Sequence, residues 1–287
     1  MKRNILTEVL KKKPPNVLYH YTTQAGLLGI IQHREIWATH TQYLNDQREY
    51  LHAVDIVQEE IHAFRERTTD SNTGETLEAM DAGVEGIESM NVCVSSFSEV
   101  GDSLPQWRAY GAATSGYAIG VKGARLVELT AKLNFFLAPC IYDRSEQRTL
   151  VRALVEEVVE EHLERRRQPS ERHMPPGGNL CAYLHRYAPI LKDPSFSEER
   201  EWRVISRPLM CTFERFEYRQ GSSMLIPYYR FPLGDDTIPF EVAEIVIGPT
   251  PNPVQSERSV RSFLASQDLR DLEQVPVRSS AVPYRNW

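Results

Sequence analysis

The chain has 287 residues, of which 41% are hydrophobic, and it carries a formal net charge of −6. This size and apolar content predict a full hydrophobic core, within one large domain or two small ones. The acidic balance argues against a protein that holds duplex nucleic acid through a broad basic face.

No apolar run approaches the roughly 18 residues that a membrane span requires, so we expect no membrane contact. The charged N-terminus is not followed by an apolar segment of signal-peptide length. The four cysteines are widely spaced, without a CxxC pair or a nearby histidine pattern, which argues against a structural zinc site. Reduced thiols of this kind are typical of a cytoplasmic protein.

Hydrophobic periodicity predicts both strands and helices in the first half of the chain. Residues 17–21 are rich in β-forming side chains, and Thr22 or Thr23 can cap a helix directly after them. Residues 51–64 repeat apolar side chains at helical spacing, whereas the polar segment 68–90 predicts a surface excursion with room for a short helix. In order, we expect a helix at 4–12, a strand at 17–21, a helix at 24–31, a strand at 35–39, a long helix that opens at 44–49, a strand at 91–98, a short helix at 102–111 and a strand at 116–121.

The second half of the chain continues this mixture. We expect a strand at 135–142, a helix at 145–166, a loop at 168–178, a helix at 180–191, a strand at 200–206, strands at 224–229 and 242–247, a helix from 252 and a strand at 274–279. Because the order has no strict βαβ rhythm, the predicted fold is α+β, with a mixed, mostly antiparallel sheet flanked by helices. We expect one domain over residues 1–287, with its core at about 17–285 and a flexible loop near 168–178.

A dense charged cluster, residues 198–203, introduces the strand predicted at 200–206. Period-2 alternation places Glu199, Glu201 and Arg203 on one face. Trp202 then points to the other face, into a core. Carboxylates at the mouth of a strand can stabilise positive charge, bind a metal or act as an acid or base. A solvated face with internal ion pairs explains the same pattern.

Outside this cluster, the sequence contains no P-loop, no GxGxxG, no GxSxG and no HExxH motif. His20 ends the first predicted strand, and local sequence alone favours a partly buried imidazole there. The serines at 95, 96 and 98 end another strand. A structural role, in which their hydroxyls fill the strand end, explains them better than a role as the nucleophile of a serine hydrolase. Trp37, Trp107 and Tyr110 are predicted to be core or groove walls, and such rings can also stack on a heteroaromatic ligand.

The segment Asn45-Asp46-x2-Glu49 opens the long helix of the first half. A helix cap followed by first-turn carboxylates explains it fully. Metal binding by Asp46 and Glu49 is the weaker alternative, and we predict no metal site.

Several blocks, taken in order, resemble the bacterial domain-of-unknown-function family 2971. The resemblance runs from about residue 17 to about residue 285, and the family label implies no activity. The blocks are Leu18-Tyr19-His20-Tyr21-Thr22, Trp37 with Asn45-Asp46-x2-Glu49, Ser96-Phe97-Ser98, Trp107-x2-Tyr110-Gly111, Glu199-x-Glu201-Trp202-Arg203, Ile247-Gly248-Pro249 and Ser280-x2-Pro283-Tyr284-Arg285.

A second resemblance is to the ADP-ribosyltransferase superfamily. There, a His or Arg that ends a first strand is followed by a hydroxyl-rich strand end and then by Glu-x-Glu on a later strand. This chain has His20, then the serines at 95–98, then Glu199-x-Glu201, although Phe97 interrupts the hydroxyl pattern and Trp202 has no counterpart. The opening 18–22 is also similar to the start of DNA-modifying toxins in that superfamily.

This second resemblance implies a fold like that of ADP-ribosyltransferases and an NAD-consuming transferase or NAD glycohydrolase, acting as a toxin or a phage-defence effector. Glu201 would stabilise the oxocarbenium-like ribose and Glu199 would orient the acceptor. His20 would hold NAD, and the acceptor could be protein, nucleic acid or water. The supporting residues would be Ser96 or Ser98 for Glu201, and Tyr21 or Tyr110 for stacking on nicotinamide.

Two other functions remain open. The chain could be a non-enzymatic sensor or partner-binding protein of a defence or toxin–antitoxin system, with a structural acidic cluster. It could also be a metal-dependent nuclease that uses Asp46, Glu49, Glu199 and Glu201, although no known spacing matches. Stabilisation by NAD, by a divalent metal or by neither distinguishes the three functions.

Overall fold

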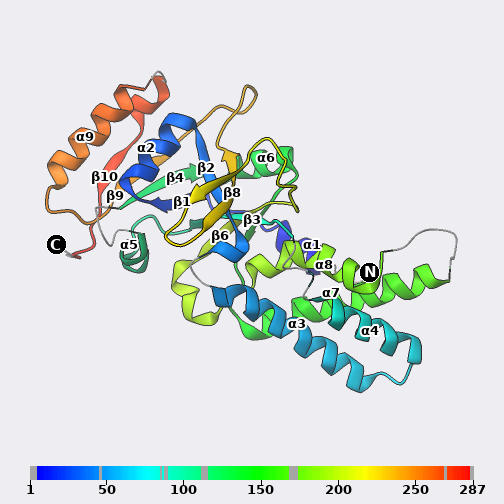
Figure 1. Cartoon of the computed structure of the whole chain (residues 1–287). Helices are drawn as coiled ribbons and strands as arrows, with labels where there is room; N and C mark the ends of the chain where they lie inside the picture. The colour runs from blue at the N-terminus through cyan, green and yellow to red at the C-terminus, as the bar shows by residue number, and fades with distance from the viewer. Residues whose placement is uncertain are drawn as a thin grey trace.

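The computed structural model describes residues 5–44, 47–84, 86, 90–110, 116–167, 174–267 and 270–284. Figure 1 shows the strands at the centre of the molecule and a group of long helices gathered at one end. The helices are α1 (Ile5–Leu10), α2 (Gln24–His33), α3 (Gln47–Arg67), α4 (Ser71–Gly83), α5 (Leu104–Tyr110), α6 (Gly123–Leu133), α7 (Arg144–Arg166), α8 (Pro176–Tyr187) and α9 (Pro253–Ala265).

The strands of the described residues form one sheet of ten, in the order β10-β9-β4-β1-β3-β2-β8-β7, with β6 beside β3 and β5 beside β6. Within this sheet the β9–β10 pair is parallel and the other strand pairs are antiparallel. The predicted α+β class, a mixed and mostly antiparallel sheet flanked by helices, is therefore confirmed. The strands are β1 (Val17–Thr22), β2 (Glu35–His40), β3 (Cys93–Ser98), β4 (Tyr117–Lys122), β5 (Phe136–Pro139), β6 (Glu201–Ile205), β7 (Phe216–Gln220), β8 (Leu225–Pro232), β9 (Glu244–Ile247) and β10 (Val277–Ser279).

Local sequence signals set several of these boundaries. The Thr23 side chain caps α2 by accepting a hydrogen bond from the Gly26 amide at 3.2 Å. The helix ends at Arg34, which adopts the left-handed conformation with φ 58°. Asp143 caps α7 in the same way, through the Glu146 amide at 2.8 Å.

Other parts of the fold differ from the sequence-based expectation. The segment 68–90 contains α4, whose Leu77 and Met80 are buried among the long helices rather than exposed. Helix α8 starts at Pro176, inside the range predicted as a loop, because proline suits the first helical turn. Helix α6 and strand β7 were not predicted at all, and residues 168–173 lie outside the described residues.

Two glycines, Gly83 on α4 and Gly177 on α8, allow these helices to approach closely. A Cβ atom on Gly83 would lie 2.4 Å from the Gly177 Cα, which is closer than any real contact of that kind. Gly83 and Gly177 therefore form a helix crossing that larger side chains would force apart.

Apolar side chains pack on both faces of the sheet. One face is covered by α2, α6 and α9, and Trp202 and Val204 of β6 point into this layer. The opposite face is covered at one end by the long helices, which bury Val94 and Ile205. At the other end of this face, α5 packs its Trp107 side chain against Tyr21.

The residues between these two covers form the floor of the candidate site. On β3 and β6 the facing pairs run Val94 with Ile205, Ser96 with Arg203, and Ser98 with Glu201. Facing residues of an antiparallel pair share one side of the sheet, so Arg203 and Glu201 lie on the same side as Ile205. The predicted alternation of Glu201 and Arg203 against Trp202 and Val204 is confirmed.

The sheet also splits along one edge of β3. That edge pairs with β2 at Cys93 and Val94 and with β1 at Ser98, so β1 and β2 diverge from each other. Among the strand pairs described, the stretch 95–97 has a neighbour in β6 but none on the split edge. The backbone carbonyls of this edge are therefore open to side chains that enter the split.

Candidate functional site

A cleft of about 530 Å³ lies over this floor, between the long helices and α5. It receives side chains from β1, β2, β3, α5, β6, β7 and the segment just before β6. The structure brings together in this cleft all the residues predicted to form an NAD site: His20, Tyr21, Ser96, Ser98, Tyr110, Glu199 and Glu201.

Glu201 is buried at the base of the cleft, with 5% of its surface exposed, and two cations hold it. The Arg203 guanidinium donates through Nε to Oε1 at 2.7 Å and through Nη2 to Oε2 at 3.2 Å. Lys192 donates to Oε2 as well. Burial raises the pKa of Glu201, but Arg203 and Lys192 outweigh it and hold that pKa at about 2. The carboxylate is therefore ionised at neutral pH.

Lys192 joins the two predicted carboxylates, because its ammonium also donates to Glu199. The lysine side chain is buried, and its backbone carbonyl accepts a hydrogen bond from Gln147 Nε2 at 2.7 Å. Glu199 was predicted to continue the strand alternation of Glu201 and Arg203, but it ends the 3₁₀ helix Pro194–Glu199 instead. Arg200 follows with φ 45°, and this left-handed turn separates Glu199 from Glu201.

Ser98 supports this turn rather than the Glu201 carboxylate, the role that the resemblance to ADP-ribosyltransferases implied for Ser96 or Ser98. Its hydroxyl donates to the Glu199 backbone carbonyl at 2.7 Å and accepts from the Val100 amide at 3.1 Å. The Glu201 amide, in turn, donates to the Tyr142 hydroxyl at 2.9 Å. Ser98 and Tyr142 therefore fix the backbone on which Glu199 and Glu201 stand.

His20 enters the split in the sheet. Its Nδ1 lies 2.9 Å from the Ser96 backbone carbonyl, and its ring packs 5.6 Å from the Phe97 ring. A carbonyl oxygen can only accept, so Nδ1 carries the proton of the neutral ring and Nε2 is left as an acceptor. Burial lowers the pKa of His20 below its usual value, although the bond to Ser96 acts in the opposite direction. His20 is therefore a neutral imidazole in the wall of the cleft.

Aromatic rings form the wall on the α5 side. The Tyr21 hydroxyl donates to the Val100 carbonyl at 2.7 Å, and its ring meets Trp107 edge-on at 4.7 Å. Tyr110 stacks on Tyr21 at 6.5 Å and keeps 40% of its surface exposed. Burial of its hydroxyl end and the charges of the nearby glutamates raise the pKa of Tyr110 to about 12.

Some cleft residues were not predicted as site residues. Lys192 and Arg219 had no local sequence signal, and Trp37 was expected as core or groove wall, with stacking on a heteroaromatic ligand as the alternative. Trp37 is half exposed and packs against Tyr228 at 4.6 Å, whereas Trp107 is buried. Trp37 is therefore a groove wall and Trp107 a core residue.

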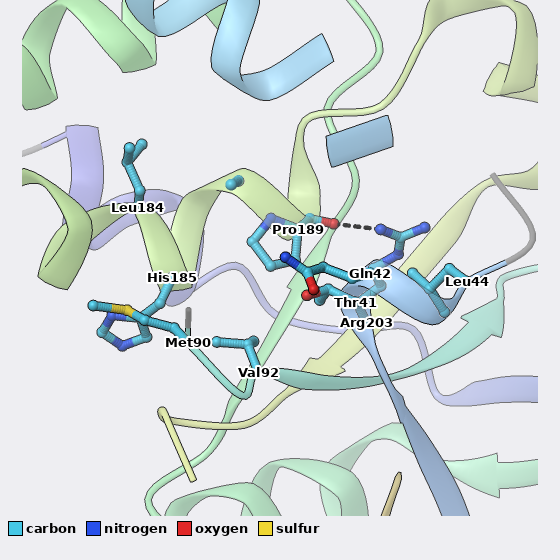
Figure 2. A pocket seen from close by; sticks show the side chains of 10 residues that line it. Thr41, Gln42, Leu44, Met90, Val92, Leu184, His185, Pro189 and Arg203 are labelled. Atoms are coloured by element: carbon cyan, nitrogen blue, oxygen red, sulfur yellow. Dashed lines mark hydrogen bonds between the residues drawn. The ribbon is translucent and has the colours of Figure 1, made fainter. Parts of the chain in front are cut away.

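Arg203 also faces a second, much smaller cavity on the side of the long helices (Figure 2). Its Nη1 donates to the Pro189 backbone carbonyl at 2.7 Å, as the dashed line in Figure 2 shows. This cavity measures about 30 Å³, which is room for a water molecule or two but not for a nucleotide. Arg203 thus anchors the floor of the large cleft to the helices beside it.

The metal-binding alternative rests partly on residues that the structure does not describe. Asn45 and Asp46 lie outside the described residues, as does the side chain of Glu49. Among the described residues, no three His, Cys, Asp or Glu side chains gather as a metal cluster would require. Within the same residues, no helix combines the length and apolar character needed to cross a bilayer.

A comparison with known families gives one match. The family model described as "Protein of unknown function (DUF2971)" matches residues 106–204, which run from α5 to β6. This match supports the predicted resemblance to that family, and it includes Tyr110, Glu199 and Glu201 but not His20 or the serines of β3. No curated protein and no solved structure matches the chain.

Proposed function

We propose that the cleft binds NAD and that the protein is an NAD-consuming ADP-ribosyltransferase or NAD glycohydrolase. The observation that carries the proposal is the meeting of His20, the β3 serines and the Glu199–Glu201 pair around one cleft. These segments are far apart in the sequence, and their order along the chain resembles that of the corresponding segments in ADP-ribosyltransferases. The cleft volume of about 530 Å³ is typical of small-molecule sites.

In this proposal Glu201 stabilises the charge that develops as the bond between nicotinamide and ribose breaks. The bonding electron pair leaves with nicotinamide, and the ribose carbon becomes oxocarbenium-like. Arg203 and Lys192 keep Glu201 ionised and fixed in position, which is the preorganisation that charge stabilisation requires. Oε1 accepts from Arg203 Nε and retains a second acceptor position for the ribose 2′-hydroxyl.

The other predicted residues would hold the substrate and the acceptor. Glu199 would orient the acceptor, whose oxygen bonds to the ribose carbon and loses its proton. Nε2 of His20 would accept a hydrogen bond from the NAD ribose or carboxamide. Tyr110, half exposed beside Tyr21, would stack on the nicotinamide ring. Ser96 contributes through its backbone carbonyl, which orients His20.

The proposed biological role is that of a toxin or phage-defence effector with an antitoxin or defence partner. Water as acceptor makes the protein an NAD glycohydrolase, and a protein or nucleic acid as acceptor makes it a transferase. Each acceptor leaves free nicotinamide as the common product.

A second candidate function, a sensor that binds a nucleotide without consuming it, is favoured by the ion pairs of Glu201. Arg203 and Lys192 already neutralise the charge of this carboxylate and occupy hydrogen-bond positions on it, so it can serve as a rigid part of a binding site. A nuclease is supported least, because a divalent cation would have to displace Lys192 from both Glu199 and Glu201.

Thermal unfolding with added ligands tests whether the protein binds NAD, a divalent metal or neither. At about 100 times its Kd, NAD should raise the Tm of the purified protein by about 5 °C or more. Stabilisation by Mg²⁺ or Mn²⁺ alone would support the nuclease instead. No stabilisation by NAD or by metal would contradict the proposal and leave the partner-binding function.

A further inference from the structure

The positive charges that line the cleft are not equally compensated. Lys192 and Arg203 both contact Glu201, and Lys192 also contacts Glu199. Arg219, on β7, also lines the cleft, but no carboxylate of the described residues lies within salt-bridge distance of it. Arg219 therefore remains a cation available to an anionic ligand.

The hydrogen bonds of Arg219 show the same deficit. Its Nη2 reaches the Thr39 hydroxyl only at 3.5 Å, the limit of a hydrogen bond. Its Nε is buried and has no hydrogen-bond partner among the described residues. An unpartnered buried donor costs free energy, and a bound oxyanion would remove that cost.

Two acidic side chains near β7, Glu217 and Glu35, contact a different arginine, Arg230. Glu217 contacts Arg230 at 3.0 Å and accepts a hydrogen bond from the Tyr228 hydroxyl at 2.9 Å. Glu35 lies 3.7 Å from the same Arg230. Arg230 thus takes up both carboxylates, and Arg219 keeps its charge for the cleft.

An aromatic platform lies on the same side of the sheet as Arg219. Thr39 faces Tyr228 and Trp37 faces Arg230 across β2 and β8, and Glu217 faces Tyr228 across β7 and β8. Because side chains alternate along a strand, Trp37, Thr39 and Arg219 all lie on the cleft side. Trp37 is half exposed and is supported from one side by Tyr228.

We propose that Arg219, Thr39 and Trp37 form a nucleoside-monophosphate subsite, in which Arg219 binds the phosphate and the ring of Trp37 stacks on the base. A guanidinium forms two parallel hydrogen bonds with a phosphate, and the Thr39 hydroxyl supplies a further donor. A tryptophan face suits any heteroaromatic base. The subsite rests on the proposed function only in taking the ligand to be a nucleotide. Within NAD, the adenosine monophosphate half would then bind to the side chains of β2 and β7.

Titration calorimetry of the full chain with AMP, adenosine and inorganic phosphate tests the subsite. The wild type should bind AMP more tightly than adenosine. Arg219→Gln should weaken AMP binding about 10- to 100-fold, the loss of a charge-assisted hydrogen-bond pair, and leave adenosine binding unchanged. Trp37→Ala should weaken both nucleoside ligands and leave inorganic phosphate unchanged.

Arg215→Gln is the matched control, because Arg215 precedes the same strand and is not among the residues that line the cleft. It should bind all three ligands as the wild type does, and a Tm near that of the wild type verifies the fold of each variant. Equal AMP affinity in wild type and Arg219→Gln, or no AMP binding by the wild type, would overturn the subsite.

The outcome also separates the subsite from the enzyme. Arg219-dependent AMP binding without release of nicotinamide from NAD would keep the subsite and refute the enzyme. Nicotinamide release with the same KM in wild type and Arg219→Gln would keep the enzyme and refute the subsite.

Discussion

Arg203 donates two hydrogen bonds to Glu201, from Nε to Oε1 at 2.7 Å and from Nη2 to Oε2 at 3.2 Å, and both side chains are buried. The two residues stand two apart on β6 and share one side of the sheet. Removing one residue of a buried ion pair leaves the other as an uncompensated buried charge. Replacing both residues with apolar ones also removes the free-energy cost of burying the charges. The first prediction follows from this asymmetry.

Arg203→Met should lower the free energy of unfolding by about 3–5 kcal/mol, because Glu201 loses its two-bond partner. The double variant Glu201→Leu/Arg203→Met should lose clearly less than the sum of the single variants. Urea unfolding of the three variants measures this coupling. Arg258→Met, at an exposed site on α9, should change stability by no more than about 0.5 kcal/mol. Additive losses would show that the pair is not coupled.

The stability that Glu201 contributes should depend on pH. Its pKa in the folded protein, about 2, lies below the usual 4.5, so its contribution is present above pH 4.5 and is lost as the pH falls towards 2. The difference in unfolding free energy between wild type and Glu201→Gln should shrink by roughly 3 kcal/mol over that range. Urea unfolding at a series of pH values measures it. A difference that stays constant down to pH 2 would contradict the ion pairs described above.

His20 should be neutral at pH 7 with its proton on Nδ1, because Nδ1 donates to the Ser96 carbonyl. Its pKa should lie below 6.5, since burial opposes the charged form. Two-dimensional ¹⁵N NMR of the imidazole ring distinguishes the tautomers and follows the titration. A proton on Nε2, or a pKa above 6.5, would remove the acceptor that the cleft needs from His20.

The glycine crossing of α4 and α8 predicts opposite effects for two changes within one helix. Gly83→Ala should cost about 1–3 kcal/mol, because its Cβ would clash with the backbone of Gly177. Gly74→Ala, where a Cβ meets nothing within 4 Å, should stabilise the protein by about 0.5–1 kcal/mol. Thermal and urea unfolding measure both changes. A neutral Gly83→Ala would show that the two helices can move apart freely.

The sequence predicts the parts of this fold that depend on local pattern. Period-2 alternation separates Glu201 and Arg203 from Trp202 and Val204, and the cap rule offers Thr22 or Thr23 as the start of α2, of which Thr23 is the cap in the structure. His20, the β3 serines and the Glu199–Glu201 pair, expected together from the resemblance to ADP-ribosyltransferases, do line one cleft. The strand alternation and the helix cap are each decided by neighbours a few positions away.

Long-range packing decides the rest of the site. Lys192 reaches Glu201 because a buried glutamine, Gln147, holds its backbone beside Ile141, and no local motif marks such a lysine. Arg219 lies on β7, a short strand at the end of the sheet order whose pattern gives no signal by itself. Gly177 lies in the range predicted as a loop and Gly83 gave no signal, and only the packing of α4 on α8 shows why both are small.

Release of nicotinamide from NAD tests the central claim most directly. Purified protein, incubated with NAD and with water as the available acceptor or with added protein or nucleic acid, should release free nicotinamide. Glu201→Gln should lower kcat by about 100-fold or more, the loss of one preorganised electrostatic stabiliser. Glu198→Gln, an exposed neighbour with the same charge change, should keep the wild-type rate. Release that is unaffected by Glu201→Gln, or no release with any acceptor, would contradict the proposed role of this cleft.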